Sequence, residues 1–187
     1  MLTIVYIHKI QLIGLMSKAY VLISGKLGLE KELVSKLKTI ENVKEVHGTL
    51  GTFDFIAKVE ADSEEQVDQT ILEKIRKIDN VSSTITLMTV EDTSSFVVDP
   101  DKLMTSILGS AAVQAYVVFH TDRGKEILVA RDFNKIPEVK EVDVVLGYYD
   151  VIGKVETTSH KELEKIVTRD IRKIENVQSS MTLIVNM

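Results

Sequence analysis

The sequence predicts an α+β protein made of two ferredoxin-like (βαββαβ) domains whose sheets pack face to face, either within one chain or between chains. Three observations lead to this fold class. The chain of 187 residues repeats itself at an offset of about 96 positions. Each repeat reads as strand, helix, strand, strand, helix, strand. The predicted strands are apolar on both faces, so each sheet needs a second cover in addition to its own helices.

The repeat aligns residues 19–90 with residues 115–186 without a gap. Roughly 27 of about 72 aligned pairs are identical, too many for chance at one fixed register. A period of this length indicates duplication of a whole small domain. The expected organisation is an N-terminal extension at 1–16, a first domain at 17–91, a linker with a short helix at 92–114 and a second domain at 115–187.

The first strand and helix of each repeat follow from hydrophobic spacing. Residues 19–24 are rich in β-branched and aromatic side chains, which favours a strand. A helix follows, because apolar residues then recur three or four positions apart. These residues are Leu29, Leu33, Leu37 and Ile40 in the first repeat, and Val129, Phe133 and Ile136 in the second.

A β-hairpin comes next, within residues 43–60 and again within residues 139–156. Its tight turns are Gly51-Thr-Phe-Asp54 and Gly147-Tyr-Tyr-Asp150. Glycine tolerates backbone angles that other residues resist, and aspartate bonds local backbone donors. Each turn therefore holds a polar residue at the mouth of its hairpin.

A second helix begins at the capping boxes Ser63-Glu-Glu-Gln66 and Ser159-His-Lys-Glu162. Its apolar face is expected to bury four residues per repeat, and last strands are expected at 81–90 and 177–185. The buried residues are Val67, Ile71, Ile75 and Ile78, and then Leu163, Val167, Ile171 and Ile174. A short helix from Asp99-Pro100 to Gly109 is interpreted either as part of the linker or as a partner-docking helix.

Composition excludes several classes of protein. A net charge of −5 gives no broad attraction to nucleic acid or anionic lipid. The absence of cysteine excludes disulfides and thiolate metal sites. Residues 1–15 are apolar but too short to span a bilayer, and they lack the features of a signal peptide. We therefore expect a cytoplasmic protein with no direct nucleic-acid partner and no membrane partner.

No catalytic constellation is visible in the sequence. It contains no phosphate-binding glycine loop, no HExxH motif and no nucleophile elbow. His47 aligns with Asp143 and His120 with Ser24, so neither histidine is shared by the repeats. We expect no catalytic residue, no metal site and no cofactor.

Three polar features do recur in both repeats, and they leave two interpretations open. They are the glycine and aspartate of the turn, two hydroxyl residues at a spacing of two in the last strand, and Glu60 with Glu156. Threonine favours strands and aspartate favours turns without any function. Alternatively, the carboxylate, turn amides and hydroxyls hold the ammonium and carboxylate groups of a small zwitterion.

Four motifs recur in order in both repeats. In the first repeat they are Ala19-Tyr-Val-Leu-Ile, Gly51-Thr-Phe-Asp54-Phe-Ile-Ala-Lys-Val, Ile75-Arg-Lys-Ile and Val81-Ser-Ser-Thr-Ile-Thr-Leu. Through these motifs the sequence resembles the effector-binding (RAM) domain of the Lrp/AsnC, or feast/famine, family of transcription regulators. The resemblance implies packing of the dimeric α/β-barrel type and further assembly. It also implies an amino acid or similar metabolite bound near the turn, at Gly51, Asp54, Thr84 and Thr86 and at Gly147, Tyr148, Asp150, Ser180 and Thr182.

Regulators of this family carry an N-terminal helix-turn-helix, which we do not find in the residues before the first repeat. The expected function is therefore a tandem, stand-alone binding module that forms a homo-oligomer or a mixed oligomer with full-length relatives. Two alternatives remain. One is an enzyme of the monooxygenase or haem-dependent α/β-barrel type, with His47 or His120 in the barrel; the other is a purely structural assembly partner.

Overall fold

Both repeats fold with the same order of elements, within the residues that the computed structural model describes (16–26, 28–90 and 113–186). The first repeat comprises β1 (Ser17–Gly25), α2 (Glu30–Lys38), β2 (Val43–Leu50), β3 (Phe55–Ala61), α3 (Glu64–Gln69), a π-helical turn η1 (Thr70–Ile75) and β4 (Val81–Thr89). The second comprises β5 (Val113–Thr121), α5 (Glu126–Asn134), β6 (Val139–Leu146), β7 (Val151–Thr157), α6 (His160–Arg169), a 3-10 turn η3 (Ile171–Lys173) and β8 (Val177–Val185). The predicted fold class is confirmed.

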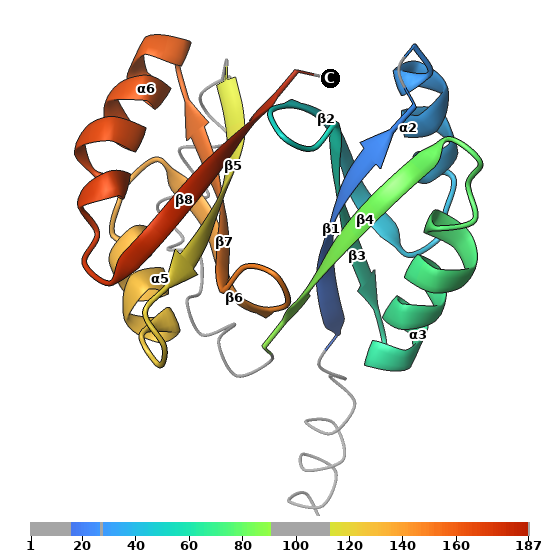
Figure 1. Cartoon of the computed structure of the whole chain (residues 1–187), viewed down its shortest axis with the longest axis horizontal. Coiled ribbons are helices and arrows are strands. Elements are labelled where there is room, and N and C mark those ends of the chain that lie inside the picture. Colours follow the sequence, from blue (N-terminus) through green and yellow to red (C-terminus); the bar gives the residue numbers. More distant parts are fainter. Residues whose placement is uncertain (1–15, 27, 91–112, 187) are drawn as a thin grey trace, which may run out of the picture.

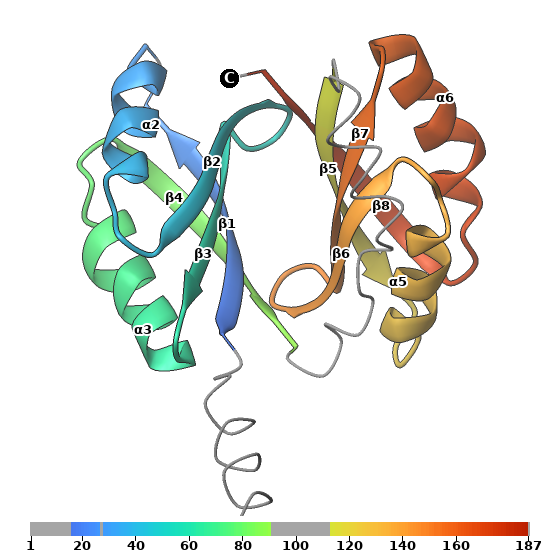
Figure 2. The same cartoon turned by 180° about the vertical axis from the view of Figure 1, so that it is seen from behind.

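The two sheets join into a closed antiparallel barrel with the strand order β1-β3-β2-β8-β5-β7-β6-β4. Two short contacts between the repeats close it. Thr49 of β2 lies opposite Val185 of β8, and Thr89 of β4 lies opposite Val145 of β6. The helices α2 and α3 cover one flank and α5 and α6 the opposite flank (Figures 1 and 2). The sheets thus face each other within one chain.

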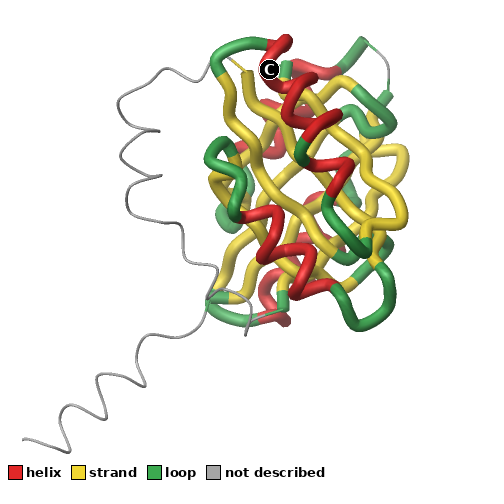
Figure 3. Tube along the Cα trace, turned by 90° about the vertical axis from the view of Figure 1, so that its left-hand side faces the viewer, coloured by secondary structure: helices red, strands yellow, loops and turns green. Residues whose placement is uncertain are grey.

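Helices cover the outer face of each sheet and form a core with it, and Figure 3 shows the helices of the second repeat lying over their sheet. Each second helix begins at the predicted cap, where the Ser63 and Ser159 hydroxyls accept hydrogen bonds from the N–H groups of Gln66 and Glu162 at 3.3 and 3.2 Å. Leu29, which precedes the first residue of α2, is 36% exposed, contrary to the prediction. Most of the other predicted apolar residues are buried, whereas Ile40, Ile78, Ile136, Val167 and Ile174 are only partly buried. The buried ones are Leu33, Leu37, Val67, Ile71 and Ile75, with Val129, Phe133, Leu163 and Ile171 in the second repeat.

These two helix-facing cores have diverged together at one contact. Phe133 of α5 replaces Leu37 of α2, and Gly153 of β7 replaces Ala57 of β3. A Cβ atom at Gly153 would lie 2.4 Å from the Phe133 ring, closer than real Cβ contacts occur. The larger ring in the second repeat therefore requires the smaller residue beneath it.

The inner faces of the sheets form a third core inside the barrel. Leu22, Ile56 and Leu87 from the first repeat meet Val118, Ile152 and Leu183 from the second. Tyr20 and Tyr116 complete this core, with ring centroids 6.3 Å apart and edge-on packing. The expectation that each bare sheet face is covered by the other repeat is thus fulfilled.

The predicted N-terminal extension, apart from Met16, and the whole of the predicted linker helix lie outside the described residues, at positions 1–15 and 91–112. Among the helices that are described, none is long and apolar enough to cross a membrane.

Replacing Leu183 with alanine should destabilise the protein by about 2–5 kcal/mol, because it leaves a cavity in the barrel core. Leu183 is fully buried, whereas Ile127 on α5 is 57% exposed. Ile127→Ala is the matched control and should change the free energy of unfolding by less than about 1 kcal/mol. Urea denaturation of both variants measures the difference, and equal losses would contradict the barrel assignment.

Candidate functional site

The two turn aspartates tie each hairpin to the end of the first strand of its own repeat. The Asp54 carboxylate accepts a hydrogen bond from the Gly25 N–H at 2.8 Å, and Asp150 accepts one from the Thr121 N–H at 2.7 Å. The backbone N–H groups of these aspartates also donate to the carbonyls of Ile23 and Phe119, at 3.0 and 2.9 Å. Each aspartate therefore holds its turn against the first strand of its repeat. A role for the aspartates in ligand binding remains a prediction.

The turn glycines lie against the last strand of the other repeat. Gly51 approaches Thr182 and Leu183, and Gly147 approaches Thr86 and Leu87. Gly147 has a φ of +155°, and a Cβ atom there would lie 2.6 Å from the Thr86 carbonyl oxygen. Only glycine fits this close approach of the two backbones. The structure thus brings predicted site residues of one repeat beside predicted site residues of the other.

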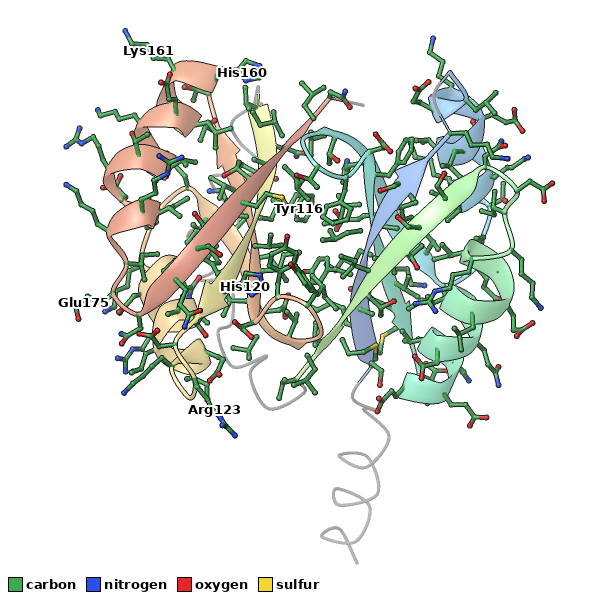
Figure 4. The ribbon with its side chains drawn as sticks, viewed as in Figure 1. Tyr116, His120, Arg123, His160, Lys161 and Glu175 are labelled. Carbon is green, nitrogen blue, oxygen red and sulfur yellow. The ribbon has the colours of Figure 1, made fainter. Side chains whose placement is uncertain are left out.

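An aromatic group surrounds the second turn. Tyr148 is 63% exposed, and its ring packs edge-on against those of His120 and Tyr149, at 5.1 and 5.0 Å between centroids. His120 Nδ1 lies 3.9 Å from the Asp150 carboxylate, beside the β6–β7 turn (Figure 4). The first turn carries Thr52 in place of Tyr148, so the two turns present different surfaces.

The predicted hydroxyl donors of the first repeat lie on the outer, helix-facing side of β4. The Arg76 guanidinium, at the end of η1, donates to the hydroxyls of Thr84 and Thr86 at 2.9 and 3.4 Å. These hydroxyls are therefore already engaged within the repeat.

The equivalent hydroxyls of the second repeat line an open groove. Ser180 and Thr182 of β8 face His160, Glu164 and Arg172 across a volume of about 770 Å³ between α6 and β8. Within the part of the chain that is described, the Arg172 guanidinium has no hydrogen-bond or ion-pair partner. This groove brings together a cation, a carboxylate and two hydroxyl groups.

A second polar cluster lies inside the barrel, next to the apolar core. We call it the charged layer: Lys18, Glu45, Lys58 and Glu60 of the first repeat, and Glu141, Asp143, Lys154 and Glu156 of the second. Most of its contacts cross between repeats. Lys58 contacts Glu141 at 2.8 Å and Lys154 contacts Glu45 at 3.0 Å.

Two tyrosines connect this layer to the apolar core. The Tyr20 hydroxyl donates to Asp143 at 2.8 Å, and the Tyr116 hydroxyl donates to Glu45 at 3.1 Å. Tyr116 lies centrally between the two sheets (Figure 4). His47 packs against the Tyr116 ring, and its Nε2 lies 3.3 Å from Glu45. His47 thus lies inside the barrel. His120 follows Tyr116 on the same face of β5, and its ring centroid lies 4.7 Å from that of Tyr149 in the inner core.

The close contacts change the acidity of several groups in this layer. The hydrogen bond from His47, assisted by Lys154 and Lys58, holds the pKa of Glu45 well below its usual range. Burial alone would raise the pKa of Glu141, but the ammonium groups of Lys18 and Lys58 lower it. Burial and the nearby Glu45 raise the pKa of Tyr116. Glu45 and Glu141 are therefore charged at neutral pH, and each contacts a lysine of the other repeat.

Sequence reasoning did not identify Arg172 or most of the charged layer. Arg172 becomes a groove residue only because β8 passes beside it. The repetition of Glu60 and Glu156 was noticed, and each lies within 4.0 Å of a lysine of its own strand. The described residues contain no group of three side chains suited to a metal ion.

The Lrp/AsnC ligand binding domain family matches this chain twice, at residues 18–96 and 114–186. The chain belongs to this family. HTH-type transcriptional regulator FL11 of Pyrococcus horikoshii is 31% identical over 118 residues, which are 63% of this chain and 69% of that protein. An uncharacterized HTH-type regulator of Pyrococcus furiosus is 36% identical over 59 residues, which are 32% of this chain and 39% of that protein. The Lrp/AsnC assignment predicted from sequence is confirmed.

Among solved structures, siroheme decarboxylase NirDL has a similar fold, with a TM-score of 0.65 over 92% of this chain and 72% of that one. The two are 11% identical, so the likeness concerns the fold alone. This Lrp/AsnC chain spans 39% of the first curated relative and 69% of FL11.

Replacing Asp150 with alanine should lower the free energy of unfolding by about 1–3 kcal/mol, because the Thr121 N–H loses its acceptor. Asp68→Ala, on the exposed surface of α3, is the control and should have little effect. Thermal unfolding of both variants measures the difference. An Asp150→Ala protein as stable as wild type would show that the turn does not need this bond.

The lowered pKa values of Glu45 and Glu141 predict acid lability. An unfolded glutamate has a pKa of about 4.3, so the stabilisation is present above about pH 4.3 and is lost as pH falls below it. Glu141→Gln should therefore be less stable than wild type at pH 7 and lose less stability between about pH 5 and pH 3. Glu175→Gln is the control, since Glu175 lies at the periphery (Figure 4). If the free energy of unfolding changed with pH in the same way in wild type and Glu141→Gln, the stabilising role of Glu141 in the charged layer would be contradicted.

Proposed function

We propose that this chain binds a small zwitterionic metabolite of the amino-acid class and does not itself catalyse a reaction. The observation that carries the proposal is the groove between α6 and β8, where Arg172, Glu164, Ser180 and Thr182 line one volume. The family's matched domain is described as ligand binding, which supports the same conclusion.

The groove has the complementary groups that a zwitterion needs. A guanidinium binds a carboxylate through two parallel N–H bonds, and hydroxyls can donate to the same oxygens. A carboxylate such as Glu164 accepts from an ammonium group. Because Arg172 has no partner among the described residues, a ligand there displaces no internal bond.

The two repeats are proposed to differ in affinity. In the first repeat a ligand must compete with Thr84 and Thr86 for the Arg76 guanidinium. The second repeat offers the same hydroxyl pair without that competition. The predicted ligand residues Thr84 and Thr86 are thus proposed to form the weaker site.

The hairpin turns are proposed to act as assembly surfaces that complete the site. Leu50, Leu146 and Tyr148 are large apolar residues exposed at the turns. Their neighbours Gly51, Asp54, Gly147 and Asp150 hold the turns in shape, and a further copy or a relative can then pack on them. Homo-oligomers and mixed oligomers with Lrp/AsnC relatives both fit this surface.

One observation keeps an enzymatic alternative open, since His47 lies inside the barrel beside Tyr116. The Nε2 atom of His47 lies 3.3 Å from the Glu45 carboxylate, and this contact favours a structural role for His47 over a catalytic one. Absorbance of a bound haem or flavin in protein purified from its source would favour the enzyme.

Calorimetric titration with each of the twenty amino acids tests the proposal. At least one should bind, and Arg172→Gln should weaken it about 10-fold or more, because a charge-assisted bond is lost. Arg169→Gln, on the exposed last turn of α6, is the matched control and should bind as wild type. Folded protein that binds none of the twenty, or equal affinity in both variants, would overturn the proposal.

A further inference from the structure

We propose that the charged layer makes each repeat select the other repeat as its partner in the barrel, over a second copy of itself. This inference concerns pairing and does not depend on the ligand. The barrel face of each repeat is thus an interaction surface whose matching partner is the unlike repeat.

The two repeats contribute unequal charge to the layer. The first repeat supplies two lysines and two glutamates, and the second supplies one lysine and three carboxylates. A barrel of two second repeats would gather two lysines and six carboxylates in one partly buried layer. The observed barrel holds three lysines and five carboxylates, and a barrel of two first repeats would hold four of each. The excess of negative charge therefore disfavours the pairing of two second repeats.

The asymmetry is concentrated in one contact between the repeats. Asp143 is 4% exposed, and it accepts from Lys18 Nζ at 2.7 Å and from the Tyr20 hydroxyl at 2.8 Å. Lys18 also contacts Glu141 at 2.9 Å. A carboxylate buried to this degree is strongly unfavourable without a cation beside it.

At the equivalent contact both charges have been replaced by groups without a fixed charge. Gln114 occupies the position of Lys18, and His47 occupies the position of Asp143. Gln114 donates to Glu156 at 3.1 Å, and His47 contacts Glu45. The cation and the anion therefore occur in different repeats, and they meet only when unlike repeats pair.

Pairing of like repeats would separate these groups. Two second repeats would place each buried Asp143 opposite Gln114, with no lysine at that position. Two first repeats would place each Lys18 opposite His47. Only the unlike pairing gives Asp143 its lysine.

Introduced cysteines can report which repeats pair, because the chain has none of its own. Thr49→Cys with Val185→Cys reports unlike pairing, since these residues lie opposite each other across β2 and β8. Thr49→Cys with Thr89→Cys reports pairing of two first repeats, because Thr89 occupies the position equivalent to Val185. The second cross-link joins two chains and appears as a covalent dimer on a non-reducing gel.

Each cysteine pair is refolded from denaturant at low and high protein concentration, in four backgrounds. The wild-type chain should form only the 49–185 cross-link. Asp143→Lys places a lysine beside Lys18, but only in a barrel of unlike repeats. It should therefore favour pairing of like repeats and raise the yield of the 49–89 cross-link about tenfold or more at high protein concentration. His47→Lys is the matched control, because it introduces a lysine at the equivalent position of the first repeat, where Glu45 lies beside it. This variant should not raise the yield of the 49–89 cross-link. The exchanged pair Lys18→Glu with Asp143→Lys should restore the wild-type pattern.

An Asp143→Lys chain that still gives only the 49–185 cross-link at every concentration would overturn the inference. So would failure of both Asp143→Lys and the exchanged pair to fold, because position 143 would then need its carboxylate for a reason other than Lys18. Loss of folding in the single variant with recovery in the exchanged pair supports the proposed selection.

Discussion

The whole structure depends on the need of each sheet for two covers. Helices bury one face of each four-stranded sheet, and the opposite face carries residues such as Leu22 and Ile56 that cannot remain in water. Joining two such sheets buries both faces at once, and closing the barrel satisfies the strand edges where β2 meets β8 and β4 meets β6. The duplicated chain supplies both halves of this arrangement.

Duplication has also allowed the two halves to become different. The pair Phe133 and Gly153 replaces Leu37 and Ala57 in one helix-facing core, where the larger ring of Phe133 lies over the smaller residue Gly153. Lys18 and Asp143 have become complementary where Gln114 and His47 have not. A single-domain chain that pairs with its own copy cannot separate its residues in this way, because every change appears twice.

The polar groups of the barrel and those of the outer groove have different environments and different consequences. In the charged layer, carboxylates and ammonium groups satisfy one another, so the layer contributes mainly to pairing and to acid sensitivity. In the groove between α6 and β8, Arg172 has no partner among the described residues and can meet a ligand. Of these two clusters, the groove is the one that combines access for a ligand with hydrogen-bond donors that have no partner among the described residues.

The sequence by itself determined the repeat, the order of its elements, the capping serines and the apolar faces, because these depend on spacing along one chain. It also determined the family, since the motifs that carry it are local. The turn residues Gly147 and Asp150 were found for the same reason. What they contact was decided by the tertiary structure, which turns the Asp150 carboxylate toward Thr121 and places Gly147 on β4 of the other repeat. The groove at Arg172 and the contact of Lys18 with Asp143 were likewise decided only by folding, because they join residues whose separation in sequence carries no periodic signal.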